Sequence, residues 1–207
     1  MTLCGRAGLG LDAGAAPGHA WVHAPSAAAH DFVAGDAGDF AAIAERRARG
    51  ELRAVSTLLT RSNLRTLAGM PAWLAGLPWR VVVAAGAAVD GVTPRLAMAV
   101  PYALQALARA GGTIEGAPHC LLGPFRGAGR GAPRAYAPVC GGCPARARCP
   151  GVAAGYLARF GADELSPRAL RDVAARTGRA GAGDMFAGTG ALTWRGAGGE
   201  PAGAGAG

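Results

Sequence analysis

The feature that most constrains this chain is a run of closely spaced cysteines in a segment with little else to fold around. Cys140, Cys143 and Cys149 form a C-x2-C-x5-C pattern, and Cys120 precedes it. Residues 116–150 are rich in Pro, Gly and Arg and have almost no periodic apolar pattern, so a hydrophobic core does not account for their order. We therefore expect a bound metal to supply it.

The spacing within this run suits a shared centre. Two cysteines three positions apart can turn both thiolates toward one point, and Gly141 and Gly142 between them leave room for backbone amides to approach sulfur. Pro144 and Pro150 stiffen the run, which reduces the entropy lost when Cys149 returns to the same centre.

The fourth ligand of a tetrahedral set is predicted to be Cys120, in the phrase APHCLLGPF, with His119 as the runner-up. Cys4 lies far away in a segment of low complexity and is predicted to be a bystander. Five cysteines, three of them within ten residues, fit poorly with a secreted disulfide framework, although unligated or disulfide-bonded cysteines remain an alternative. In a reducing compartment this crowding indicates metal.

Iron–sulfur and zinc both accept thiolates, and the spacing favours the first. Structural zinc sites usually use two C-x2-C knuckles, whereas this chain has one. A three-cysteine run with unequal spacings and a distant fourth cysteine is more typical of a four-iron cluster. Arg146 and Arg148 would offset the negative charge of such an all-thiolate cluster and tune its reduction potential.

Upstream of the cysteines, strand-like and helix-like segments alternate. The strands are expected at 20–26, 52–60 and 79–84, and the helices at 36–49, 64–75 and 96–110. The run WRVVVA is apolar almost throughout, which predicts a parallel strand covered on both faces. This alternation predicts an α/β fold with a parallel sheet and right-handed crossovers, in which three units form an incomplete layer.

The other segments complete the expected organisation. A short helix is predicted over 152–160 with Tyr156 and Leu157 facing inward, and Ser166 is a candidate cap for another helix. Three tryptophans are expected in the core and three histidines at the surface or in turns: Trp21, Trp73, Trp79, His19, His23 and His30. The predicted divisions are a poorly determined segment 1–19, an α/β domain 20–115, a cysteine segment 116–167, and a helix with a Gly/Ala-rich tail 168–207.

Composition and charge restrict the function less than the cysteines do. The formal net charge is +8 and every basic residue is Arg. Because these arginines are scattered instead of clustered with aromatic residues, nucleotide bias explains them better than a nucleic-acid surface does. The sequence contains neither an apolar stretch long enough for a membrane span nor a secretory signal, so a cytoplasmic protein is expected.

The phrase PVCGGCPARARCPGVAAGYLARFGADELSP resembles the carboxy-terminal cluster segment of radical SAM enzymes with a SPASM- or twitch-like extension, with Gly151, Tyr156, Glu164 and Pro167 at the family's positions. VHAPSAAAHDFVAGDAGDF and STLLTRSN are similar to the later half of the radical SAM barrel, so the resemblance covers about residues 20–167.

This resemblance implies a partial (β/α) radical-SAM-like barrel of about three βα units, followed by a small cysteine-rich segment. It implies that Cys120, Cys140, Cys143 and Cys149 bind an auxiliary 4Fe-4S cluster. It also implies that two polar residues lie near the barrel mouth, where the sugar and amino acid of SAM would sit: Ser26 and Asn63.

One departure from the family decides what activity to expect. The C-x3-C-x2-C triad that binds and reduces SAM is missing, and by this resemblance the chain begins near the middle of the barrel. Reductive cleavage of SAM by this chain alone is therefore not expected, and a partner protein would supply the SAM-cleaving half-barrel.

Two other functions remain open. One is a zinc-stapled binding or interaction module. The other is a nucleotide-binding enzyme, suggested by the glycines of residues 181–192, although that segment follows no clear strand and lacks the Lys of a phosphate loop.

Overall fold

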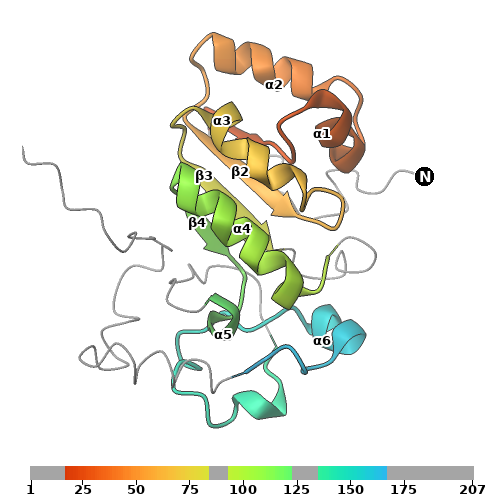
Figure 1. The fold of residues 1–207 in the computed structure, drawn as a ribbon, viewed down its shortest axis with the longest axis vertical. Helices are drawn as coiled ribbons and strands as arrows, with labels where there is room; N and C mark the ends of the chain where they lie inside the picture. Colours follow the sequence, from red (N-terminus) through yellow and green to blue (C-terminus); the bar gives the residue numbers. More distant parts are fainter. Residues whose placement is uncertain (1–16, 84–92, 123–134, 167–207) are drawn as a thin grey trace, which may run out of the picture.

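The computed structural model describes residues 17–83, 93–122 and 135–166 (Figure 1). Its centre is a sheet of four parallel strands in the order β1-β2-β3-β4. The strands are β1 His19–Trp21, β2 Ala54–Leu59, β3 Trp79–Val83 and β4 Thr113–Glu115. The predicted α/β class with a parallel sheet is therefore confirmed, with each strand beside the next one in the sequence.

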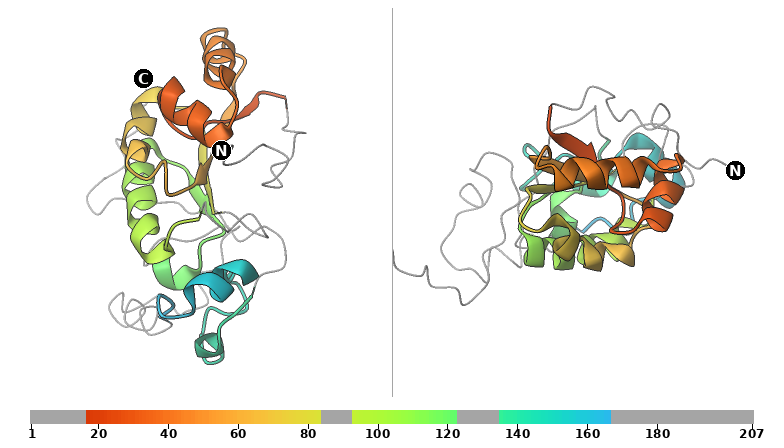
Figure 2. Two further views of the ribbon diagram at one scale, coloured as in Figure 1. Left: turned by 90° about the vertical axis from the view of Figure 1, so that its right-hand side faces the viewer. Right: turned by 90° about the horizontal axis from the view of Figure 1, so that it is seen from above.

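Helices connect the strands and follow the last one. Their bounds are α1 Ala27–Ala34, α2 Asp39–Ala48, η2 Thr66–Gly69, α3 Met70–Leu74, α4 Leu96–Ala110, α5 His119–Leu122, η4 Pro138–Cys140 and α6 Ala154–Phe160. Figures 1 and 2 show α3 and α4 along the same face of the sheet, with α1 and α2 at the end of the molecule opposite the cysteine segment.

The core lies between the sheet and these helices. Val81 and Ile114 of the sheet are fully buried, as are Ala99, Val100 and Ala103 of α4. The small alanine side chains let α4 approach the sheet closely, and its apolar face explains why the sequence pattern places this helix at its observed bounds. The helix expected over 64–75 begins instead as a 3-10 turn, η2, before α3.

Four short elements were missed from the sequence: α1, β4, α5 and η4. α1 has only eight residues and three consecutive alanines, so its apolar face is weak. β4 has three residues between Gly112 and Gly116, which is too few to show the alternation of a strand.

The second face of the sheet carries a row of polar side chains. The Nε2 of His19 lies 2.8 Å from the Oγ of Ser56, which accepts a bond of 3.0 Å from the Nε of Arg80. Arg80 also donates to Glu115 at 3.3 Å. Arg80 and Val82 are only partly buried, so the expectation that β3 is covered on both faces is wrong. The side chains of Trp79, Val81 and Val83 are buried on one face of β3, and Arg80 joins the polar row on the other.

The predicted surface position of the histidines is wrong for two of them. His23 and His30 are only 4% and 0% exposed. The ring of His30 accepts the backbone N–H of His23 through Nδ1, and its Nε2 lies 3.1 Å from a carboxylate oxygen of Asp39. His30, in α1, therefore connects the segment that follows β1 to α2. Of the tryptophans, Trp79 is buried as predicted, whereas Trp21 and Trp73 are partly exposed.

Several predictions fall outside the described residues: those for Cys4, for the helix after Ser166, for residues 181–192 and for the tail. Among the described helices, none combines the length and the apolar character that a bilayer crossing needs.

Candidate metal centre

The structure brings Cys120, Cys140, Cys143 and Cys149 together around one pocket. Cys120 comes from α5, directly after β4, and the other three come from the loop that contains η4. Apolar walls are provided by Pro118, Val152 and Leu165. The four predicted ligands are thus neighbours, although the first is 20 residues or more from the others in the sequence.

Backbone hydrogen bonds hold the loop in this shape. Ala135 and Val152 form an antiparallel bridge, with N···O distances of 2.8 and 3.1 Å, that closes the loop at its base. Inside it, the N–H of Cys143 donates to the carbonyl of Cys140 at 3.2 Å, and the N–H of Cys149 donates to the carbonyl of Ala145 at 2.9 Å. Consecutive tight turns therefore return the chain to the pocket three times.

Backbone N–H groups also point at the sulfur of Cys149. His119 and Gly151 each donate to this sulfur at 3.4 Å. Gly151 has a φ of +66°, a conformation that strongly favours glycine. Such donors favour the thiolate over the thiol and are a usual surrounding of metal-bound sulfur.

Burial in the pocket disfavours the thiolate forms of Cys120 and Cys149. Burial raises the pKa of Cys120 to about 11, and the other three thiols add to the shift. Burial likewise raises the pKa of Cys149, against the two N–H donors. Metal binding at neutral pH therefore releases protons, and apparent metal affinity rises with pH.

The arrangement is not that of a closed site for a single ion. In residues 17–83, 93–122 and 135–166, no group of three or more His, Cys, Asp or Glu side chains is placed to hold a metal ion. A tetrahedral zinc site, with Zn–S bonds of about 2.3 Å, requires sulfur atoms about 3.8 Å apart. The four cysteines share a pocket and influence one another electrostatically.

The raised pKa of Cys120 predicts slow alkylation of this thiol in the metal-free protein. Because the thiolate is the reactive form, a pKa of about 11 in place of 9.0 lowers the alkylation rate at pH 8 about hundredfold relative to the unfolded chain. Mass spectrometry after timed treatment with iodoacetamide, with and without urea, measures both rates. Equal rates in the two conditions would contradict the burial of this thiol.

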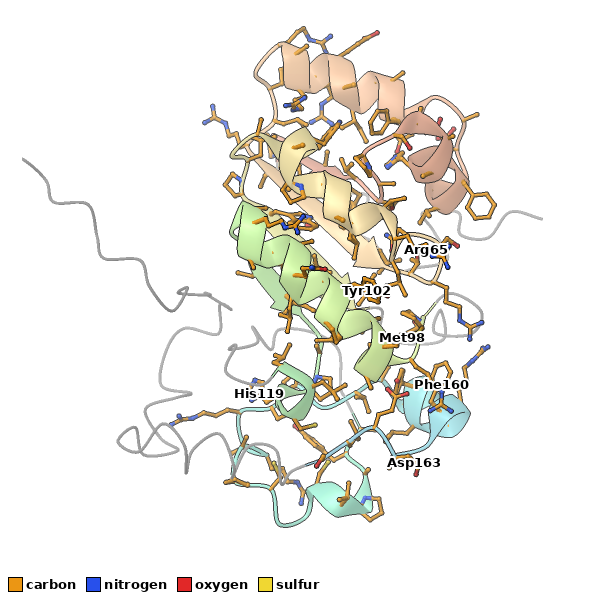
Figure 3. The ribbon with its side chains drawn as sticks, viewed as in Figure 1. Arg65, Met98, Tyr102, His119, Phe160 and Asp163 are labelled. Atoms are coloured by element: carbon orange, nitrogen blue, oxygen red, sulfur yellow. The ribbon has the colours of Figure 1, made fainter. Side chains whose placement is uncertain are left out.

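The cysteine segment is fastened to the amino-terminal end of α4. The hydroxyl of Tyr156 accepts the N–H of Leu96 at 2.8 Å and donates to Glu164 at 2.6 Å. Glu164 also accepts the N–H of Ala97 at 2.9 Å and pairs with Arg95 at 3.1 Å. A carboxylate here satisfies free N–H groups of the first helical turn and faces the positive end of the helix dipole. Figure 3 shows Phe160 and Asp163 beside this end of α4.

This contact predicts that Tyr156→Phe lowers the free energy of unfolding by about 1–2 kcal/mol, because the buried N–H of Leu96 loses its acceptor. Tyr102, on the outer face of α4 in Figure 3 and 49% exposed, supplies a matched control. Urea denaturation should show a clear decrease for Tyr156→Phe and a change within about 0.5 kcal/mol for Tyr102→Phe. Equal midpoints for these two variants would contradict the role of Tyr156.

The structure places the remaining predicted site residues as follows. His119 is buried and contributes its backbone N–H to Cys149, while its neighbours Pro118 and Cys120 line the pocket. Ser26 is exposed at the start of α1. Asn63 is fully buried, and its side-chain amide bonds the carbonyls of His23 and Leu58. Whether Ser26 and Asn63 contact SAM remains a prediction.

Of the pocket-lining residues that were not singled out from the sequence, Tyr136 is the one with a polar group in its side chain. Tyr136 lines the pocket, and its hydroxyl donates to the carbonyl of Cys149 at 2.7 Å. The only available signal was an aromatic residue four positions before Cys140, in a stretch otherwise made of small residues and Pro. No family model, curated protein or solved structure matches this chain.

Proposed function

We propose that this chain binds an iron–sulfur cluster of the auxiliary 4Fe-4S type through Cys120, Cys140, Cys143 and Cys149. The observation that carries the proposal is that four thiols from two separate segments line one pocket. Each iron of a four-iron cluster takes one thiolate, so four cysteines complete the set. The group would bring electron transfer to this site, and the protein would supply its ligands and surroundings.

The surroundings of the thiols support a negatively charged metal group. Two backbone N–H groups point at Cys149, and Arg146 lies at the pocket. Hydrogen bonds to sulfur and nearby positive charge are the features by which proteins stabilise and tune thiolate-bound clusters. Burial raises the pKa values of Cys120 and Cys149. Bound metal cations would lower these pKa values again, because cations favour the deprotonated sulfurs.

Anaerobic reconstitution with ferrous iron and sulfide tests the proposal against a zinc-stapled module. The reconstituted protein should give the electron paramagnetic resonance signal of a reduced cluster after dithionite treatment, and its Tm should rise. Zinc without sulfide should raise the Tm less. If zinc stabilises the chain fully and iron with sulfide gives no signal, the interaction-module alternative replaces the cluster.

The wider context of this cluster is proposed from the resemblance to radical SAM proteins. The parallel strands in consecutive order are compatible with part of a (β/α) barrel, and the polar row of His19, Ser56 and Arg80 would then face its interior. A partner that carries the missing triad would supply the SAM-cleaving half. With SAM and dithionite, the chain alone should form no 5′-deoxyadenosine, and its formation would refute this division of labour.

A further inference from the structure

Among the described residues, Arg146 is the one charged side chain that lines the pocket together with the four cysteines. In the described part of the chain, no carboxylate lies within ion-pair distance of it, so a full positive charge stands at the pocket. Arg148, two positions later, is exposed like Arg146 but does not belong to the pocket lining. The two arginines of the cysteine run, equivalent in the sequence, are therefore distinguished by the structure.

Tyr136 fixes where this charge lies. The guanidinium carbon of Arg146 is 5.3 Å from the centre of the Tyr136 ring, within the range of a cation–π contact. The hydroxyl of the same ring donates to the carbonyl of Cys149 at 2.7 Å. Tyr136 thus connects the backbone of a proposed ligand to the cation, although both side chains are exposed to solvent on their outer side.

We infer that Arg146, positioned by the ring of Tyr136, raises the reduction potential of the group that the four cysteines bind. This inference rests on the proposed function. One-electron reduction adds a negative charge among the thiolates, and a nearby cation stabilises the reduced form more than the oxidised form. Because the site is partly exposed to solvent and salt, we expect an effect of about tenfold or less in the ratio of reduced to oxidised protein.

The test is an anaerobic redox titration of the reconstituted full chain, with dithionite as electron donor and electron paramagnetic resonance as readout. Arg146→Gln should lower the ratio of reduced to oxidised protein at a fixed potential by about three- to tenfold, where tenfold corresponds to 59 mV for one electron. Arg146→Lys should retain most of the wild-type ratio. Arg148→Gln, the matched control, should change it by less than about twofold.

Substitutions of Tyr136 separate positioning from a merely structural role. Tyr136→Phe keeps the ring and loses the bond to Cys149, so the potential should remain near that of the wild type. Tyr136→Leu removes the ring and should lower the potential toward that of Arg146→Gln. Adding Tyr136→Leu to Arg146→Gln should not lower the reduction potential further, because the two residues act as a unit.

The outcomes distinguish the inference from the proposal beneath it. If the wild type takes up no iron and sulfide, both are refuted. If every variant holds the cluster and Arg146→Gln has the same potential as Arg148→Gln, the inference alone is overturned. If the double variant with Tyr136→Leu and Arg146→Gln has a lower reduction potential than Arg146→Gln alone, the positioning role of Tyr136 is overturned.

Discussion

Replacement of Cys143 by Ser is expected to lower the iron and sulfide bound per chain by about tenfold or more after anaerobic reconstitution. A serine hydroxyl is a poor ligand for iron at neutral pH, and the three remaining cysteines leave one iron without its thiolate. The backbone of Cys143 is held by hydrogen bonds on both sides, because its N–H donates to Cys140 and its carbonyl accepts the N–H of Arg146. Ferrozine and methylene-blue assays on gel-filtered protein measure the loss.

Cys4→Ser is the matched control for this experiment, since Cys4 is predicted not to be a ligand. This variant should bind as much iron and sulfide as the wild type. Metal-free Cys143→Ser should also unfold at about the same urea concentration as the metal-free wild type, because the side chain is only partly buried. Full cluster content in Cys143→Ser, or its loss in Cys4→Ser, would contradict the ligand assignment.

The second large effect is expected for Asn63→Ala, which should lower the free energy of unfolding by about 3 kcal/mol. Asn63 is 0% exposed. Its amide donates to the carbonyls of His23 and Leu58 at 2.9 and 2.7 Å, and its oxygen accepts the N–H of Thr60 at 2.9 Å. Alanine leaves three buried backbone groups without these partners, and each such loss costs about 1–3 kcal/mol before relaxation.

Ser62 is exposed and adjacent in the chain, so Ser62→Ala provides the control. Urea denaturation followed by circular dichroism should show a large decrease in stability for Asn63→Ala and little change for Ser62→Ala. This comparison also bears on the resemblance, which implies that Asn63 lies near SAM. Unchanged stability of Asn63→Ala would mean that the side chain does not tie the segment after β1 to β2.

β2, β3 and the long helix α4 could be predicted from the sequence because their patterns extend over enough residues. α4 has an apolar face over four turns, and β2 is an aliphatic and β-branched run that ends before a polar turn. β4 and α1 could not, because three residues between glycines and eight residues rich in alanine do not display a period. Their places are set by packing against elements that lie elsewhere in the chain.

In the candidate site, too, the residues that a local sequence pattern indicates could be predicted and the others could not. Spacing alone identifies Cys140, Cys143 and Cys149, since ligands close in sequence must also be close in space. Cys120 followed from its local phrase, and the structure brings it to the same pocket. No sequence pattern indicates the role proposed for Tyr136, because this role depends on a contact of its ring with Arg146 across the loop.

The histidines show a different kind of error, in which residues expected at the surface are buried. A lone histidine in a turn-rich stretch suggests the surface, yet His30 is completely buried. Its burial is possible because both ring nitrogens are used: one accepts the N–H of His23 and the other meets the carboxylate of Asp39. The two partners lie in different segments, one after β1 and one in α2, and no local pattern in the sequence could have indicated that they meet at His30.

The central claim is that four thiols of this chain share one iron–sulfur cluster, and elemental analysis of anaerobically purified wild-type protein tests it most directly. Iron, zinc and acid-labile sulfide should be measured on the same sample. We expect about four iron and about four sulfide per chain, with little zinc. Stoichiometric zinc without sulfide, or protein with no bound metal after reconstitution, would contradict this account.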